Sequence, residues 1–408
     1  MLKNLKKSRG KGYPIKTALV LLPGCIALLM TGFGIIVPVF PQRLEALGLG
    51  AQTLALMEVA FGLGMFLFST PTGTLADRIG RKPIILLALA GFIVTNLMLA
   101  TVNIPPVFIL IRFVEGMFIS GLMPASMAII GDSIPSEKQG RWIGFITAAQ
   151  ASGLVLGPGI GGFLYQAWGF SSPFLISAGL AFIASLLALI LLPETLPAHV
   201  RKHARLSRIK KRQVERGSNG TLPRVSILLR ALMPLLIIDC GITFIYPFVL
   251  PQYPFYLMKA LGYSALQFGI IASVYGLSLA VFPAFLGQLC EASPKKLLIM
   301  LGSLLYSTLN VGMLFLHQYV LLLGAAMVTG IGNALLLPAL STIYLGFTTE
   351  QHRSQVMGIR GTAISLGTLL GPLAQALASP WITPQTAFVI AIALSLVITL
   401  LASVVLKN

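Results

Sequence analysis

The stretch GTLADRIGRK, residues 73–82, lies between two long apolar runs and carries four charges, Asp77, Arg78, Arg81 and Lys82. Each of these charges would cost several kcal/mol near the centre of a lipid bilayer. A charged segment between two apolar segments of membrane-spanning length is therefore predicted to be a loop at a membrane surface.

The composition of the whole chain agrees with a membrane setting. Of its 408 residues, 56% are hydrophobic and only 10% are charged, and the mean hydropathy is +0.90, whereas soluble domains carry roughly 25% charged residues. The apolar runs are long and rich in Gly and Leu, which favours membrane helices over the short alternating strands of a β-barrel. We therefore expect an all-α membrane protein.

Apolar runs of about 20 residues predict twelve transmembrane helices in two sets of six. Residues 1–16 are expected to be a tail, and the polar residues 194–228 a basic linker between an N-terminal bundle, 17–193, and a C-terminal bundle, 229–408. The expected helices are 17–41, 52–76, 83–102, 106–131, 140–166 and 172–193 in the first set, and 229–250, 263–289, 296–316, 319–345, 354–379 and 384–405 in the second.

The two sets of helices are internal repeats. A shift of 214 positions places Gly and Pro residues of the first half on Gly and Pro residues of the second, and gives residues 73–82 a weaker twin at 287–296. Six helices followed by six related helices are typical of a transporter with a central site between two pseudo-symmetric bundles. The matches include Gly73 with Gly287, Asp77 with Glu291, Gly116 with Gly330, Gly153 with Gly367, and Gly157-Pro158 with Gly371-Pro372.

The basic residues indicate how the chain is oriented. The formal net charge is +18, and the 29 Lys and Arg residues cluster in alternate loops, while the intervening loops hold only Arg43 and Lys259. By the positive-inside bias, both termini and the linker are expected to face the cytoplasm across the cell's inner (plasma) membrane. This distribution argues against nucleic acid as a partner.

Four motifs resemble signatures of the major facilitator superfamily, in its subfamily of twelve-helix drug:proton antiporters. Residues 73–82 are similar to the signature of the loop between helices 2 and 3. RFVEG, residues 112–116, resembles the helix 4 signature, and GLVLGPGIGG, residues 153–162, resembles the antiporter signature of helix 5. Gly32, Pro38 and Pro41 are similar to the helix 1 pattern.

This resemblance implies the major facilitator fold and proton-coupled export. One departure is Glu115, which stands where the family often has Gln, so the family's proton site is not simply transferable. In helix 5 the glycines leave a face without side chains and Pro158 removes a backbone donor, which lets the helix pack closely and bend. The residues concerned are Gly153, Gly157, Pro158, Gly161 and Gly162.

Asp239 is the first candidate for proton coupling. It lies ten or eleven residues into the expected helix 229–250, about 16 Å deep by the helical rise, with no basic residue within one turn. Desolvation of an unpaired acid at that depth favours its neutral form, as suits a group that takes up and releases a proton. The alternative is a neutral Asp hydrogen-bonded to a neighbouring helix.

Glu58, Arg112 and Glu115 form the second candidate. Arg112 and Glu115 stand three residues apart on one helix and share a face. If helices 2 and 4 are neighbours, Glu58 joins them in one buried cluster in which Arg112 holds a carboxylate ionised until substrate or a proton displaces it. A static structural ion pair remains the alternative.

The charged loop is expected to act as a cytoplasmic gate. Asp77 is predicted to accept hydrogen bonds from a helix amino terminus and to pair with Arg81 or with Arg360, which would clamp the two halves. The alternative is that these charges only anchor the loop in the cytoplasm. The expected gate residues are Gly73, Asp77, Arg78, Gly80, Arg81, Lys82, Asp132, Glu291 and Arg360.

The substrate cavity is expected between the two halves, with aromatic and apolar walls that suit lipophilic compounds and a carboxylate that suits a cation. The expected lining is Met30, Phe33, Phe244, Tyr246, Phe248 and Tyr275. Each of these side chains has packing in the core or contact with lipid as its alternative.

The sequence therefore predicts a proton-driven exporter of small amphiphilic or cationic compounds, with multidrug efflux as the expected activity, working as a monomer in the lipid bilayer with no cofactor other than the proton gradient. Exporters of one endogenous metabolite, siderophore or lipid-linked compound, and proton-coupled nutrient symporters, remain alternatives, as does a receptor or scaffold that transports nothing. No metal-ligand spacing or catalytic Ser/His/Asp arrangement appears in the chain, so no enzyme activity is expected.

Overall fold

The structure is a computed structural model that describes residues 15–134, 136–196, 223–346 and 353–406, and these residues form helices and connecting turns. The first half contains α1 (Ile15–Ile36), α2 (Phe40–Ala46), α3 (Ala51–Ile79), α4 (Arg81–Thr101), α5 (Pro105–Ile119), α6 (Leu122–Ser133), α7 (Ser136–Trp168) and α8 (Ser171–Leu191). The second contains α11 (Pro223–Val249), α12 (Gln252–Lys259), α13 (Ala265–Ala292), α14 (Lys295–Tyr306), α15 (Thr308–Phe315), α16 (Tyr319–Gly346), α17 (Arg353–Ala378) and α18 (Pro384–Val405).

Each predicted span corresponds to one helix or to a pair of consecutive helices, so the predicted fold class is confirmed. Within the described residues, eleven segments are long and apolar enough to cross a membrane. The twelfth predicted span, 140–166, corresponds to α7, of which several side chains lie outside those that the structure describes. Two predicted spans are broken near their middle, at Ser120 between α5 and α6 and at Ser307 between α14 and α15.

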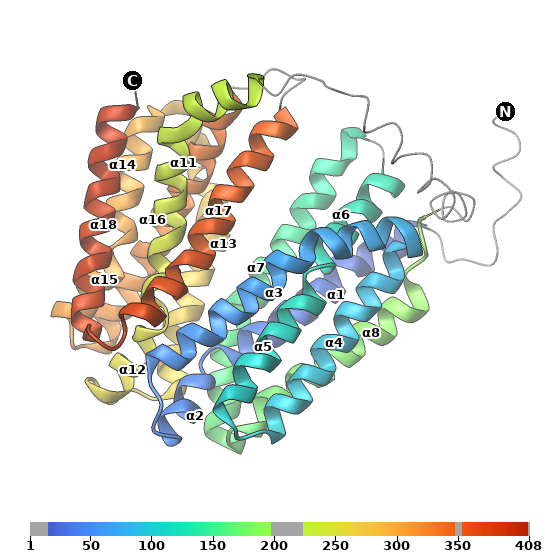
Figure 1. Cartoon of the computed structure of the whole chain (residues 1–408), viewed down its shortest axis with the longest axis horizontal. Helices are drawn as coiled ribbons and strands as arrows, with labels where there is room; N and C mark the ends of the chain where they lie inside the picture. The colour runs from blue at the N-terminus through green and yellow to red at the C-terminus, as the bar shows by residue number, and fades with distance from the viewer. Residues whose placement is uncertain (1–14, 135, 197–222, 347–352, 407–408) are drawn as a thin grey trace, which may run out of the picture.

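The helices form two groups that follow the two halves of the sequence (Figure 1). Each half has its own hydrophobic core. Because each half crosses the bundle six times, α1 begins at the end of the molecule where α8 and α18 finish, which we call the termini end. The short helices α2 and α12 lie at the opposite end (Figure 1).

The internal repeat is visible in helix packing as well as in sequence. A Cβ atom added to Gly116 of α5 would lie 2.1 Å from the carbonyl oxygen of Phe61 on α3. At the position 214 residues later, a Cβ added to Gly330 would lie 2.7 Å from the carbonyl oxygen of Tyr275, which is the repeat equivalent of Phe61. Both halves therefore use a glycine to bring the same pair of helices into close contact.

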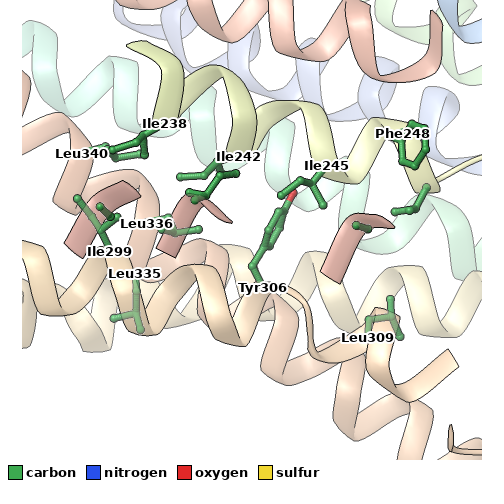
Figure 2. Close-up of a cluster of buried hydrophobic side chains, with 14 of the residues drawn as sticks. Ile238, Ile242, Ile245, Phe248, Ile299, Tyr306, Leu309, Leu335, Leu336 and Leu340 are labelled. Atoms are coloured by element: carbon green, nitrogen blue, oxygen red, sulfur yellow. The ribbon is translucent and has the colours of Figure 1, made fainter. Parts of the chain in front are cut away.

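The core of the second half shows how the helices are held together. Ile238, Ile242 and Ile245 follow one another at helical spacing on α11, so they share a face, and Figure 2 shows them turned towards α14, α15 and α16. Their partners include Leu336 and Tyr306, which are buried. Because lipid is as apolar as these side chains, close van der Waals packing rather than escape from water holds these helices together.

The contacts between the two halves gather towards the opposite end. Gln52 at the start of α3 donates a hydrogen bond of 3.2 Å to the carbonyl oxygen of Ala376 near the end of α17. A Cβ added to Gly162 of α7 would lie 2.6 Å from the carbonyl oxygen of Ala265 on α13. Figure 1 shows the two groups of helices diverging towards the termini end. The structure is therefore a conformation in which the halves meet at the opposite end.

Some predictions fall on parts that the structure leaves undescribed. Residues 1–14 of the expected tail and residues 197–222 of the expected linker lie outside the described residues, as does the side chain of Glu291. Some helix boundaries differ from prediction by several residues: α11 begins at Pro223 rather than at residue 229, and α7 begins at Ser136 rather than at residue 140.

Candidate functional site

A cavity of about 240 Å³ lies between the two halves and takes its walls from both. Of the six side chains predicted to line it, Phe33, Tyr246 and Tyr275 do so. Phe244 and Phe248 stack on each other instead, with ring centroids 5.6 Å apart. Met30 packs beside Gly153 of α7. The remaining lining residues are Ile36, Val37, Phe40, Leu54, Glu58, Arg112, Pro158, Leu250, Pro251, Pro254, Phe268, Ala272, Gly276 and Leu279.

The structure brings Glu58, Arg112 and Glu115 together at the wall of this cavity. The Arg112 guanidinium donates to a carboxylate oxygen of Glu115 at 2.8 Å and to one of Glu58 at 3.3 Å. Its carbon Cζ also lies 4.4 Å from the ring centroid of Phe61, a cation–π distance. Glu115 is fully buried, whereas 30% of the Glu58 side chain is exposed. Glu58 is therefore the acid of this cluster that a solute in the cavity reaches.

This first cluster holds more acid than base. With all three groups ionised, Arg112 supplies one positive charge against two negative charges, so the net charge is −1. An uncompensated charge in a buried site is strongly unfavourable. The cluster is neutral when it holds one proton, and a substrate cation beside Glu58 would supply the same compensation.

Asp239 belongs to a second cluster, in the C-terminal half. The expectation of an unpaired acid is wrong, because Arg360 Nε lies 2.6 Å from Asp239 Oδ2. Arg360 also donates to the hydroxyl of Ser341 at 2.7 Å and lies 5.1 Å from the ring centroid of Tyr344. Residue spacing along the expected helix 229–250 does not reveal this partner, because it comes from α17, 121 residues further along the chain.

The Asp239–Arg360 pair is balanced in charge but not in hydrogen bonds. Asp239 is 1% exposed, and its second carboxylate oxygen, Oδ1, accepts no hydrogen bond from the described residues. Asp239 also lines a separate cavity of about 180 Å³, together with Thr243, Tyr246 and Tyr275. The two cavities therefore share the side chains of Tyr246 and Tyr275.

The charged loop makes its ion pairs within the first half. Asp77 pairs with Arg81 at 3.0 Å, and Arg81 pairs with Asp132 at 3.1 Å. Arg360 lies with Asp239 and not with Asp77, so the predicted clamp between Asp77 and Arg360 is absent from this conformation. Among the other predicted gate residues, Gly73 lies beside Pro124, and Arg78 is exposed.

Glu194, and not Asp77 as expected, caps the amino terminus of α4. Its carboxylate accepts the backbone N–H groups of Arg81 at 3.1 Å and of Lys82 at 3.3 Å, at the start of α4. An anionic group at this position stabilises the positive end of the helix dipole. Gly80 makes room for it with a φ of +119°, and a Cβ there would lie 2.1 Å from Glu194 Oε2.

The helix 5 motif gives α7 two close contacts. Gly153, Gly157 and Gly161 face α1, and a Cβ on Gly161 would lie 1.9 Å from the carbonyl oxygen of Ile35. Gly162 faces α13 of the other half. Pro158 lies in the wall of the central cavity. The motif therefore packs α7 between the two halves.

Sequence reasoning missed three polar residues: Asn333, which lines the second cavity, and Ser341 and Tyr344, which contact Arg360. Asn333 carried a usable signal, since a lone amide inside the apolar run GIGNALLL of α16 is a candidate for function in a membrane helix. Among the described residues, no group of three or more His, Cys, Asp or Glu side chains has the arrangement of a metal site.

Two repeated helical bundles with a solute-sized cavity between them define a membrane transporter rather than an enzyme. The sequence profile of the Major Facilitator Superfamily matches residues 24–253 and 232–408. The chain belongs to this family, and is thus a multi-pass membrane protein that transports small molecules.

Two curated relatives extend over most of the chain. The quinolone resistance protein NorA of Staphylococcus aureus (strain COL) is 28% identical over 351 residues, which cover 85% of this chain and 86% of NorA. Multidrug resistance protein 2 of Bacillus subtilis (strain 168) is 26% identical over 362 residues, 88% of this chain and 87% of the relative.

Solved structures show the same fold. A point mutant of the nucleoside transporter NupG superposes with a TM-score of 0.76 at 14% identity, over 96% of this chain and 100% of that one. The human organic anion transporter MFSD10 (TETRAN) gives a TM-score of 0.64 at 20% identity, over 96% and 100% of the two chains.

Proposed function

We propose that this protein exports small amphiphilic or cationic compounds by proton-coupled antiport, with a spectrum that covers several unrelated drugs. The observation that carries the proposal is the excess acid of the cluster Glu58, Arg112 and Glu115 at the wall of the central cavity. The names of the two curated relatives, both resistance proteins, support export of drugs.

The net charge of the cluster Glu58, Arg112 and Glu115 gives a physical basis for exchanging a proton for a substrate cation. The cluster is neutral when it holds either one proton or one substrate cation, and holding both would leave it positive. Proton and substrate therefore compete for Glu58, which is the exposed acid. Competition of this kind at one alternately accessible site is the minimal requirement for antiport. Arg112 and the buried Glu115 hold Glu58 in place and set its electrostatic surroundings.

Asp239 is proposed as a second proton site. Arg360 neutralises it in this conformation, so protonation of Asp239 is coupled to release of Arg360. A free Arg360 is then able to pair elsewhere, and the predicted gate at Asp77 is a proposed partner in the alternate conformation. Because the pair is buried, a change of partner is accompanied by movement of α11 against α17.

Orientation follows from the basic loops. We infer that the termini end is cytoplasmic in the inner (plasma) membrane, since the charged loop 73–82 lies there and basic loops favour the inside. Contacts between the halves at the opposite end then correspond to a conformation closed towards the outside. A monomer in the lipid bilayer is the proposed working unit.

Proteoliposomes with an acidic lumen test the direction and the coupling. Antiport predicts that protons leaving the lumen drive ethidium, a lipophilic cation, into it, and that a protonophore abolishes this accumulation. Loss of ethidium from the acidic lumen would indicate symport. Ethidium accumulation that is the same with and without the proton gradient would contradict proton coupling. Glu58→Gln removes the excess acid with little change of shape, so it should abolish the accumulation while leaving expression intact.

A panel of chemically unrelated compounds separates a multidrug exporter from a dedicated one. Multidrug export predicts that ethidium and an uncharged lipophilic dye are both extruded from cells that produce the protein, and that Glu58→Gln spares the uncharged dye more than the cation. Extrusion of a single compound by the wild-type protein would favour an exporter of one endogenous metabolite.

A further inference from the structure

Asn333 on α16 is a polar side chain inside an apolar helix, outside the two charged clusters. Its amide nitrogen Nδ2 donates a hydrogen bond of 2.9 Å to the hydroxyl of Tyr275 on α13. Gly330 stands three residues earlier on the same face of α16, where a Cβ would lie 2.7 Å from the carbonyl oxygen of Tyr275. The close approach of the two helices therefore brings Asn333 within reach of this ring.

The ring that Asn333 holds is part of the substrate cavity. Tyr275 stacks on Tyr246 of α11, with ring centroids 5.1 Å apart and an angle of 14° between the ring planes. Both rings line the central cavity, and both also line the second cavity beside Asp239. Asn333 lines only the second of these two cavities. The stacked rings therefore separate the central cavity from the space that contains Asn333.

A hydrogen bond at the hydroxyl of a tyrosine adds a second anchor to the packing at the base of its ring, so a ring held at both ends is restricted to one rotamer. Tyr275 is held at its base by the packing of α13 on α16. At its hydroxyl it is held by Asn333 of α16 and by a hydrogen bond with Tyr306 of α14. Its flat face stays parallel to that of Tyr246, so the wall has the shape that receives a planar aromatic group.

We propose that Asn333 is a positioning residue for substrate specificity: it fixes Tyr275 against Tyr246 and thereby selects compounds with a flat aromatic portion. This inference rests on the proposed function, because it concerns which compounds the exporter accepts. Asn333 acts through Tyr275 and does not contact the substrate in the central cavity.

The test compares a flat aromatic cation, ethidium, with a non-planar cation of the same charge, tetrapropylammonium. Asn333→Leu removes the hydrogen bond at nearly constant volume and should raise the KM for ethidium about five-fold. Tetrapropylammonium should keep its KM within about two-fold, and the maximal rate should be unchanged for both, since the charged clusters are intact.

A double-mutant cycle tests whether the change in KM for ethidium comes from the hydrogen bond between Asn333 and Tyr275. Tyr275→Phe removes the same hydrogen bond from the other side, together with the bond to Tyr306, so the double variant should raise the KM for ethidium no further than Tyr275→Phe alone. Asn96→Leu is the control, because Asn96 is a buried asparagine of α4 that donates a hydrogen bond of 2.8 Å to the carbonyl oxygen of Phe92, and neither residue lines the central cavity. It should leave the ratio of the two KM values unchanged.

Equal shifts for both cations, no shift for either, or additive effects of the two substitutions would overturn the proposal. Binding of ethidium to the purified wild-type protein, measured in the same way, separates this proposal from the proposed function. Binding without gradient-driven transport would refute proton-coupled export but leave the role of Asn333 testable through Kd. Absence of ethidium binding to the wild-type protein would overturn the role of Asn333 itself.

Discussion

Glu45 and Lys259 occupy equivalent positions in the two repeats, 214 residues apart, and their side chains meet across the interface between the halves, with 4.0 Å between Glu45 Oε1 and Lys259 Nζ. Residues related by an approximate two-fold axis contact each other only near that axis. The repeat therefore places opposite charges on α2 and α12 where the two halves close at the opposite end.

Reversing either charge of this pair should favour separation of the halves at that end. Glu45→Lys and Lys259→Glu each create a like-charge pair, and since exposed ion pairs contribute about 1 kcal/mol or less, the conformational equilibrium should shift a few-fold. The double exchange should restore it. Crosslinking of cysteines at Gly50 and Ser379, which line one groove at this end, measures the closed fraction.

The control for this pair is a charge change on the same short helix. Arg43 of α2 bonds to Asn103 within the first half, so Arg43→Gln should leave the closed fraction unchanged. A double exchange that closes no better than the single reversals would show that Glu45 and Lys259 do not act as a pair.

Single and double substitutions of the buried pair Asp239 and Arg360 should have non-additive effects on stability. Arg360→Gln leaves a buried acid without its counter-charge and should cost about 3–5 kcal/mol in stability. Adding Asp239→Asn should recover much of the lost thermal stability in detergent. A double variant less stable than Arg360→Gln alone would contradict a mainly electrostatic pairing.

Asp239→Asn by itself tests the proposed role in coupling. The amide cannot take up and release a proton, so gradient-driven transport should be lost while facilitated equilibration of substrate continues. Transport against a gradient at the wild-type rate would remove Asp239 from the coupling mechanism.

The affinity for a cationic substrate should fall as the pH falls. The proposed competition of proton and cation for the excess acid of the first cluster means that, once protons occupy the cluster, each further unit of acidification should raise the Kd of ethidium by up to about ten-fold. In Glu58→Gln the site has no excess acid, and the Kd should be weaker but nearly independent of pH. A steep pH dependence that survives in Glu58→Gln would place the competing proton elsewhere, with Asp239 as the next candidate.

Gly80→Ala should destabilise the protein by more than a backbone effect. An L-residue at the φ of +119° and ψ of 160° of Gly80 carries strain of about 1–3 kcal/mol, and the new Cβ would also displace the Glu194 carboxylate from the start of α4. Gly48 is the matched control, with a φ of +72° and no heavy atom within 4 Å of an added Cβ. Thermal unfolding should therefore show Gly80→Ala as the more damaging of the two.

Removing the Glu194 carboxylate tests whether its clash with the new Cβ causes the loss of stability in Gly80→Ala. In a Glu194→Ala background, Gly80→Ala should cost less than it does in the wild type, because the clash is gone and only the backbone strain remains. An undiminished cost in that background would assign the effect of Gly80 to its backbone conformation alone.

The sequence by itself determined the class of protein and the repeat. Long apolar runs separated by basic loops set the number of spans, because charge is excluded from lipid wherever it has no partner. The Gly and Pro register set the 214-residue repeat, and the packing of Gly116 and Gly330 against equivalent helices follows from it. The helical spacing of Arg112 and Glu115 likewise indicated that they share a face.

Only the tertiary structure decided which charges are partners. Arg360 reaches Asp239 from a helix 121 residues away, and Glu194 rather than Asp77 caps α4. It also decided that Phe33, Tyr246 and Tyr275 line the cavity while Phe244 and Phe248 pack on each other. Span and repeat follow from local composition and spacing, but a polar partner in a membrane protein is chosen by the packing of helices distant in sequence.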